Sequence, residues 1–126
     1  MSTLNVNTVQ SSTSNPPIFK NSGGDVAGTL CRAWVNFDGT GTVAIRDSFN
    51  VSSITDNGTG NYTVNFTNAM ANSNYSAVCG QKSSSSLTYV SEINSQTSSS
   101  IQLVFFNYTN GSALDQEIVN LVVFAN

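Results

Sequence analysis

The fold is decided by residues 31–66, which read CRAWVNFDGTGTVAIRDSFNVSSITDNGTGNYTVNF. Apolar and polar residues alternate along residues 31–38 and again along residues 62–66, which is the pattern of strands with one buried face. An Asp-Gly pair at position 38 and an Asn-Gly pair at position 57 supply residues that reach the positive φ of tight hairpin turns. The stretch therefore predicts strands joined by glycine-rich turns, and it contains no nucleophile-and-base pair.

On either side of this stretch, short β-branched and aromatic runs recur between turn signals about 8–12 residues apart, as in sandwiches and barrels. No long segment has the i, i+3, i+4 apolar stripe of a helix. We expect an all-β fold, a small antiparallel β-sandwich of about eight strands with a jelly-roll-like or immunoglobulin-like topology. The predicted strands are Cys31–Asp38, Val43–Asn50, Val51–Thr55, Tyr62–Thr67, Tyr75–Gly80, Thr88–Asn94, Ile101–Asn107 and Glu117–Phe124.

The N-terminal segment differs in character from the rest of the chain. Alternation over residues 4–9 predicts one extended strand, and the Ser- and Pro-rich residues 11–17 interrupt regular structure. We interpret residues 1–28 as an extended arm or attachment segment and residues 29–126 as the sandwich domain. The alternative is that the arm is an ordinary edge strand of the same domain.

Composition excludes several classes of partner. Only 9% of the 126 residues are charged and the net charge is −3, so the basic surface that binds nucleic acid is missing. Serine, threonine and asparagine supply the polarity instead, at 50 residues. No apolar run is long enough to span a bilayer, and no secretion signal follows Met1. We expect neither nucleic-acid binding nor membrane insertion.

Catalytic and metal-binding patterns are missing from the sequence. There is no histidine, the usual general base and metal ligand, and there are seven carboxylates in all. Calcium is the metal that loop carboxylates would suit, but the spacing of a calcium-binding loop does not occur. We predict that the chain is not an enzyme and that it uses no cofactor or metal.

The two cysteines, Cys31 and Cys79, are 48 positions apart and have no metal-binding spacing. The simpler interpretation is that both are small buried residues, and a disulfide between two strands is the alternative.

Several apolar residues are predicted to face a partner. Trp34 is out of phase with the core residues of its strand and points to the other sheet face, where it could contact a subunit or stack on a carbohydrate. Runs at residues 104–106 and 121–124 place apolar groups on both faces of their strands, which indicates strands covered on both sides and favours a homo-oligomer. The candidate partner contacts are Trp34, Leu4, Val6 and Phe19.

Three loops are predicted to face outward, at residues 82–86, 95–100 and 108–114. Their many neutral donors and acceptors suit sugar hydroxyls, and plain solvated loops are the alternative. The candidate residues in these loops are Ser84, Ser85, Thr97, Tyr108 and Asn110.

The run AWVNFDGTGTVAIRDSFNVSSITDNGTGNYTVNF, residues 33–66, resembles a module common in tailed-bacteriophage proteins, mostly tail fibres. Asn68–Met70, Asn74–Ser76 and the opening MSTLNVNTVQ are also similar to such proteins. The resemblance implies a phage virion structural protein, a tail-fibre or receptor-binding appendage that forms a homotrimer. It also implies other virion proteins and a host surface glycan as partners, and a location in the virion after assembly in the host cytoplasm.

The resemblance leaves the position in the virion open. Tail fibres usually carry this module at the end of a longer shaft, whereas here it stands nearly alone, which favours a small appendage or a head protein. The alternative function is a capsid decoration (cement) protein that binds the phage head. A carbohydrate-active enzyme is a third hypothesis, which the missing histidine disfavours.

Overall fold

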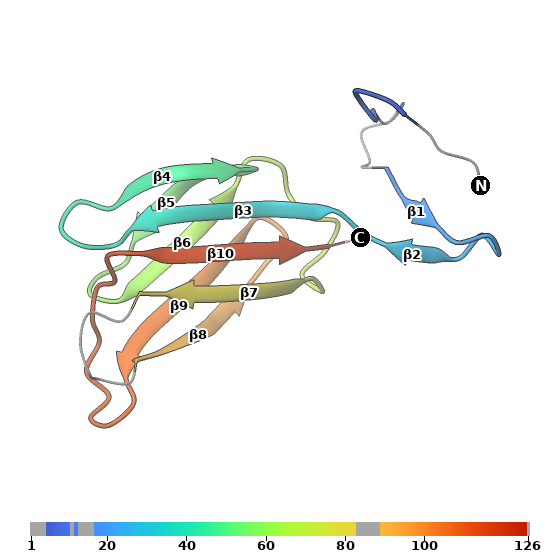
Figure 1. Cartoon of the computed structure of the whole chain (residues 1–126). Coiled ribbons are helices and arrows are strands. Elements are labelled where there is room, and N and C mark those ends of the chain that lie inside the picture. The colour runs from blue at the N-terminus through green and yellow to red at the C-terminus, as the bar shows by residue number, and fades with distance from the viewer. Residues whose placement is uncertain (1–4, 11, 13–16, 83–88, 126) are drawn as a thin grey trace. The chain divides into compact units, whose positions relative to one another are not determined.

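The structure is a computed structural model that describes residues 5–10, 12, 17–82 and 89–125. The chain divides into two compact units, Met1–Leu30 and Cys31–Asn126, which are described here one at a time (Figure 1).

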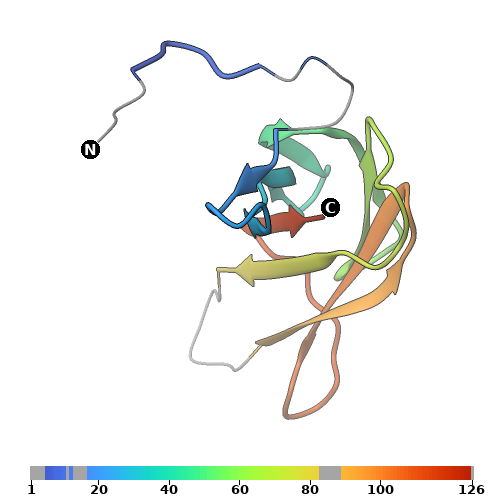
Figure 2. The same cartoon turned by 90° about the vertical axis from the view of Figure 1, so that its right-hand side faces the viewer.

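The second unit is a sandwich of two four-stranded antiparallel sheets, which face each other in Figure 2. One sheet has the order β4-β3-β10-β7 and the other has the order β5-β6-β9-β8. The first sheet consists of β3 (Cys31–Asp38), β4 (Ala44–Phe49), β7 (Ser76–Gln81) and β10 (Val119–Phe124). The second consists of β5 (Val51–Asp56), β6 (Asn61–Phe66), β8 (Tyr89–Gln96) and β9 (Ser100–Asn107).

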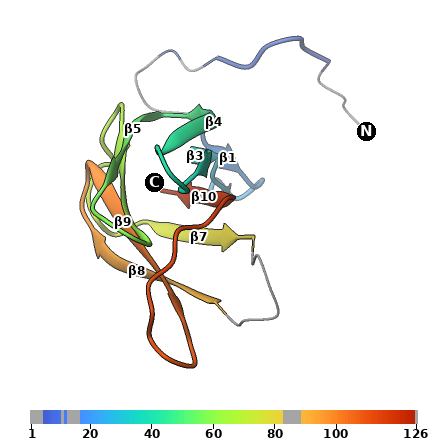
Figure 3. The same cartoon turned by 90° about the vertical axis from the view of Figure 1, so that its left-hand side faces the viewer.

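The predicted fold class, an all-β antiparallel sandwich, is confirmed. Each of the eight predicted strands is present, with ends that move by at most about two residues, the usual uncertainty of such boundaries. Within the described ranges there is no helix. The last strand, β10, lies between β3 and β7, as Figure 3 shows, so the C-terminal strand completes the middle of its sheet.

The core is built from the alternating residues that face inward on β3, β6, β9 and β10. Phe37, Tyr62 and Phe105 form an aromatic cluster in its middle, with ring centroids 5.3 Å apart for the first pair and 6.0 Å for the second. All three side chains are fully buried, and burying such a ring contributes about 1.5–3 kcal/mol. The period-two pattern of the sequence is therefore the pattern of core packing.

One turn differs from the expectation. Positive φ occurs at Gly58 (115°), as the sequence predicts, but in the turn after β3 it occurs at Gly41 (61°) and not at Gly39. The Asp38 carboxylate accepts hydrogen bonds from the backbone N–H and the hydroxyl of Thr40, at 2.9 and 2.6 Å. These bonds hold the first half of the turn, so the chain reverses two residues later than predicted.

The first unit contains a two-stranded hairpin of β1 (Phe19–Lys20) and β2 (Val26–Gly28). The side-chain oxygen of Asn21 closes its turn by accepting hydrogen bonds from the N–H groups of Gly23 and Asp25, at 2.9 and 3.0 Å. Residues 5–10 form no strand, so the strand predicted for residues 4–9 is not found at the described positions. Alternation alone does not make a strand when no neighbouring strand supplies hydrogen bonds.

Candidate binding surfaces

The far loops are the turns at residues 39–43 and 57–60 and the loop at residues 108–118. They meet at the end of the sandwich opposite Cys31, where β3, β5 and β9 finish. A backbone hydrogen bond from Gly39 to Gln116, at 2.9 Å, connects two of them, and one from Phe105 of β9 to Gly60, at 2.7 Å, holds the third against the sheet. In Figures 1 to 3 the loop that follows β9 projects beyond the strands.

A buried tyrosine holds the far loops together. The Tyr62 hydroxyl lies 2.6 Å from a carboxylate oxygen of Asp115 and 2.9 Å from the carbonyl oxygen of Gly39. The same Asp115 oxygen accepts a hydrogen bond from the backbone N–H of Gly60 at 2.7 Å. Burial, together with the Asp115 charge, raises the pKa of Tyr62 well above the ordinary value for tyrosine. The tyrosine therefore stays neutral and acts as a fixed structural donor.

Two glycines allow this close packing. A Cβ atom at Gly39 would lie 2.6 Å from the Tyr62 hydroxyl oxygen, and one at Gly60 would lie 2.5 Å from the carbonyl oxygen of Phe105. Gly60 also has a φ of 65°, which side-chain-bearing residues rarely adopt. The two glycines thus let their turns pack closely against Tyr62 and β9.

Tyr108 and Asn110 lie at the exposed tip of the longest far loop. The Tyr108 side chain is 75% exposed, and residues 107–114 carry no charge. The tip is ordered by side-chain caps, since Asn107 accepts from the N–H of Thr109 at 2.8 Å and Asn110 accepts from that of Ser112 at 3.0 Å. An exposed aromatic ring beside neutral amides and hydroxyls can stack on a sugar ring and bind its hydroxyls.

The other predicted loop residues do not share this surface. Thr97 lies in the turn between β8 and β9, and Tyr108 follows β9, so the eight residues of β9 separate them by roughly 25 Å. The Thr97 hydroxyl accepts hydrogen bonds from the N–H groups of Ser99 and Ser100 and so closes its own turn. Ser84 and Ser85 lie outside the described residues.

An apolar row crosses the outer face of the sheet β4-β3-β10-β7. Antiparallel pairing places Trp34 opposite Phe49 on one side and opposite Val122 on the other, and Val122 lies opposite Val78. Directly paired residues point to the same face of a sheet, and this is the face away from Ala33 and the core. Phe49 is 54% exposed and Val78 is 65% exposed. These four residues, Phe49, Trp34, Val122 and Val78, are called the apolar row below.

The apolar row contrasts with its surroundings. The next row of the same sheet is polar, with the side-chain amide of Asn36 donating to the side-chain oxygen of Asn120 at 2.6 Å. The outer face of the other sheet is mixed: Gln102 donates to Asn61 at 2.8 Å, and further along the strands Val90 lies opposite Phe106. A continuous line of apolar groups on a polar molecule is a candidate contact surface for another protein.

The arm residues named from the sequence are also exposed. Val6 is 49% exposed and Phe19, in β1, is 50% exposed. Leu4 lies outside the described residues. Of the described residues up to Leu30, all but Pro17 are exposed, so the arm presents several apolar side chains that its own hairpin does not cover.

The two cysteines are half-buried and free. They belong to the strands on either side of β10, where Cys31 pairs with Phe124 and Cys79 pairs with Leu121. Burial raises the pKa of the Cys79 thiol to about 11, which keeps it protonated. Both thiols are free, so the structure has no disulfide between them, and neither residue is completely buried as the simpler interpretation expected.

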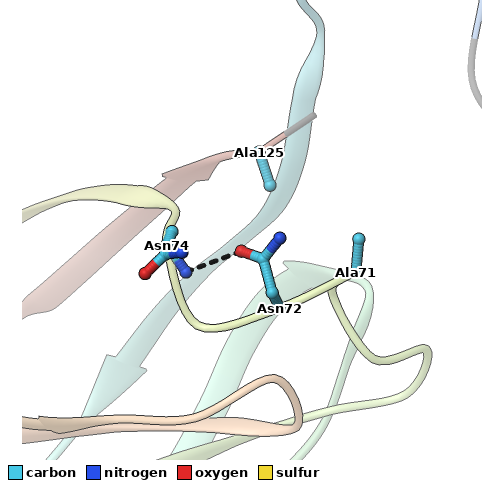
Figure 4. Close-up of a pocket in the computed structure, with 4 residues that line it drawn as sticks. All are labelled: Ala71, Asn72, Asn74 and Ala125. Carbon is cyan, nitrogen blue, oxygen red and sulfur yellow. Dashed lines mark hydrogen bonds between the residues drawn. The ribbon is translucent and has the colours of Figure 1, made fainter.

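A shallow pocket of about 220 Å³ opens near the Cys31 end of the sandwich. Its lining residues are all neutral: Ala71, Asn72, Asn74 and Ala125 (Figure 4). The side-chain oxygen of Asn72 already accepts a hydrogen bond from the backbone N–H of Asn74 at 2.8 Å. Throughout the ranges that the structure describes, no group of three or more acidic or cysteine side chains could hold a metal ion.

Sequence reasoning identified Trp34, and it placed Val122 in a run that is apolar on both strand faces, but it missed Phe49 and Val78 as contact residues. Phe49 and Val78 each look like an ordinary strand residue, and their phase relative to the core is the signal that could have found them. Asp115 was also missed, because nothing near it in the sequence points to Tyr62, 53 positions away.

Comparisons with known proteins give one likeness of fold. No protein-family model matches the chain, and no curated protein matches it. One solved structure is similar, that of the phiAB6 tailspike in complex with three-repeated oligosaccharides of Acinetobacter baumannii surface polysaccharide. The match has a TM-score of 0.55 at 12% identity and covers 98% of this chain but 30% of the tailspike. Among the described residues no helix could cross a membrane. The chain therefore has a fold like that of part of a phage tailspike.

Proposed function

We propose that this protein is a structural component of a phage virion, a tail-fibre-like or receptor-binding appendage that contacts the host surface. The observation that carries the proposal is the likeness of fold, over 98% of the chain, to a tailspike whose structure includes a surface oligosaccharide. The resemblance of residues 33–66 to phage tail-fibre modules agrees with it. In this proposal the protein is located in the virion and is assembled in the host cytoplasm.

The arrangement of the sandwich supports a division of roles. The chain enters the sandwich at Cys31, and the far loops lie at the opposite end of the strands. If the arm holds the protein on the virion, Tyr108 and Asn110 are in position to meet a host glycan. Thr97, at the Cys31 end, is not. A single small loop binds a sugar weakly, and several copies on one particle raise the overall avidity.

The proposal assigns no catalytic role. The uncharged tip of the longest far loop, residues 107–114, offers neutral donors, acceptors and an aromatic ring, which suit binding. Incubation of the purified protein with host envelope polysaccharide should release no sugar fragments, and release would contradict this part of the proposal.

The decisive experiment is to locate the chain in the particle. A reconstruction of the virion, with quantitative mass spectrometry for copy number, should find it on the tail in a few dozen copies or fewer. A copy number in the hundreds, on the head, would instead establish the capsid decoration protein.

A further inference from the structure

The sandwich has four edge strands, and three of them carry features that discourage pairing with another chain. Edge strands avoid such pairing through charged side chains and register irregularities. The strand β4 carries Arg46 and Asp47, β5 ends in Asp56, and β8 carries Glu92. Each of these three strands also has a register shift relative to its neighbour.

The fourth edge strand, β7, has neither feature. Its sequence, SAVCGQ, contains no charge and no proline. Its register with β10 runs without a shift from Ser76 to Gln81. In the described part of the chain β7 pairs with β10 alone, so its other edge presents free backbone groups. Val78, in its middle, is 65% exposed.

We propose that the free edge of β7 pairs antiparallel with β7 of a second copy of this chain, about a two-fold axis. Such a contact needs one unprotected edge per copy, and β7 is the one unprotected edge among the described strands; the resulting interface is isologous. The other three edges are poor partners because of their charges and shifts. Two β7 strands bring no charges together, so nothing opposes their approach.

One register of this pairing makes the apolar rows of the two copies continuous on the outer face. With Val78 opposite Val78 of the partner subunit, Ser76 lies opposite the partner's Gly80 and Ala77 lies opposite the partner's Cys79. All of these residues are small enough to pair without a clash. The apolar row of one copy then continues into that of the other, across a single sheet of eight strands.

The contact is small. Six residues of extended chain span about 20 Å, so strand pairing alone buries less than the ~1,200 Å² of a standard interface. We therefore expect a dimer that forms as concentration rises. Two-fold pairing predicts this dimer in place of the trimer that the family resemblance implies.

Sedimentation velocity on the full-length chain, from low to high micromolar concentration, tests the proposal. The mass should rise from 13.3 kDa towards twice that value. Val78→Lys places two ammonium groups side by side at the axis and should keep the chain monomeric, whereas the neutral Val78→Thr should still dimerise. Ser95→Lys, on the protected edge strand β8, is the matched control and should also dimerise. Unchanged thermal unfolding of Val78→Lys shows that the variant is folded, as expected for a side chain that is 65% exposed.

A cross-linking experiment tests the register. Val78→Cys should form a disulfide-linked dimer on oxidation with diamide, because directly opposed residues bring their Cβ atoms within about 4.5–5.5 Å. Ser95→Cys should not. A wild-type chain that stays monomeric throughout would overturn the proposal. So would a dimer or trimer that survives Val78→Lys, since self-association would then use another surface.

Discussion

At the scale of single residues, one buried hydroxyl group connects three loops. Tyr62 reaches from β6 to the Gly39 carbonyl and to Asp115, and Asp115 in turn binds the N–H of Gly60. A carboxylate among buried groups needs such donors, because an unsatisfied charge in this position is costly. The tyrosine therefore positions the loops that carry Tyr108 and Asn110, while it contacts no ligand itself.

Removing this hydroxyl should destabilise the sandwich. Tyr62→Phe keeps the aromatic packing and loses a hydrogen bond to a charged group, so the free energy of unfolding should fall by about 1–3 kcal/mol. Urea unfolding followed by Trp34 fluorescence measures the loss. Tyr75→Phe is the control, because the Tyr75 hydroxyl donates to the neutral carbonyl of Ser100 at 3.0 Å and its loss should cost less. A smaller loss for Tyr62→Phe than for Tyr75→Phe would contradict this assignment.

Stability should also depend on alkaline pH. Burial raises the pKa of Cys79 to about 11 and that of Tyr75 to about 12, and the pKa of Tyr62 rises further. These groups lose their protons at lower pH in the unfolded chain than in the folded one, so ionisation favours unfolding. The free energy of unfolding should be steady from neutral pH to about 9 and should fall above it. Urea titrations at a series of pH values measure this free energy. For Tyr62→Phe, the free energy of unfolding should fall less steeply above pH ~10.

The glycan-binding proposal makes its own prediction for a single side chain. Tyr108→Ala removes an exposed ring and should weaken binding to host envelope polysaccharide by about 1 kcal/mol per site, or several-fold. Biolayer interferometry with immobilised polysaccharide measures the change. Thr97→Ala, at the opposite end of β9, should leave binding unchanged. Equal losses for the two variants would show that the far loops are not the binding surface.

At the scale of elements, the apolar alternation in the sequence correctly predicted which residues of the core strands face inward. Alternation over residues 31–38 and 62–66 identified two core strands, and Trp34 was correctly assigned to the face away from the core. The same pattern over residues 4–9 was misleading, because no strand among the described residues pairs with residues 5–10. Alternation reports which face of a strand is apolar, and it does not report whether a partner strand exists.

The sequence alone did not predict which distant strands pair with each other. The apolar row exists because β10, the last strand, lies between β3 and β7, and no local signal marks that position. Trp34 and Val122 are 88 residues apart but directly opposed. The contrast between β7 and the other edge strands likewise becomes visible once the sheet order is known, because only then is it clear which strands are edges.

At the scale of the whole molecule, the sandwich has two different ends and two different faces. The far loops occupy one end, and the chain enters at the other, at Cys31. One outer face carries the apolar row, and the other carries polar side chains around Gln102 together with the Val90–Phe106 pair. The three proposed contacts, with the virion, with a second copy and with a host glycan, would therefore use separate surfaces.

The arm should be needed for incorporation into the virion but not for folding. Deleting residues 2–28 leaves all eight sandwich strands and the buried core intact, so circular dichroism and thermal unfolding should change little. The two-stranded hairpin of the arm is too small to be stable alone, and Phe19 and Val26 are each at least half exposed. Such a segment gains its stability by binding a partner, which in the proposed function is another virion protein.

Particles assembled with the truncated chain should therefore carry little of it, as measured by mass spectrometry relative to the major head protein. Full-length Phe19→Ser, which keeps the arm but removes one apolar contact, should reduce the copy number less. Normal incorporation of the truncated chain would transfer the docking role to the sandwich, with the apolar row as the surface to test next.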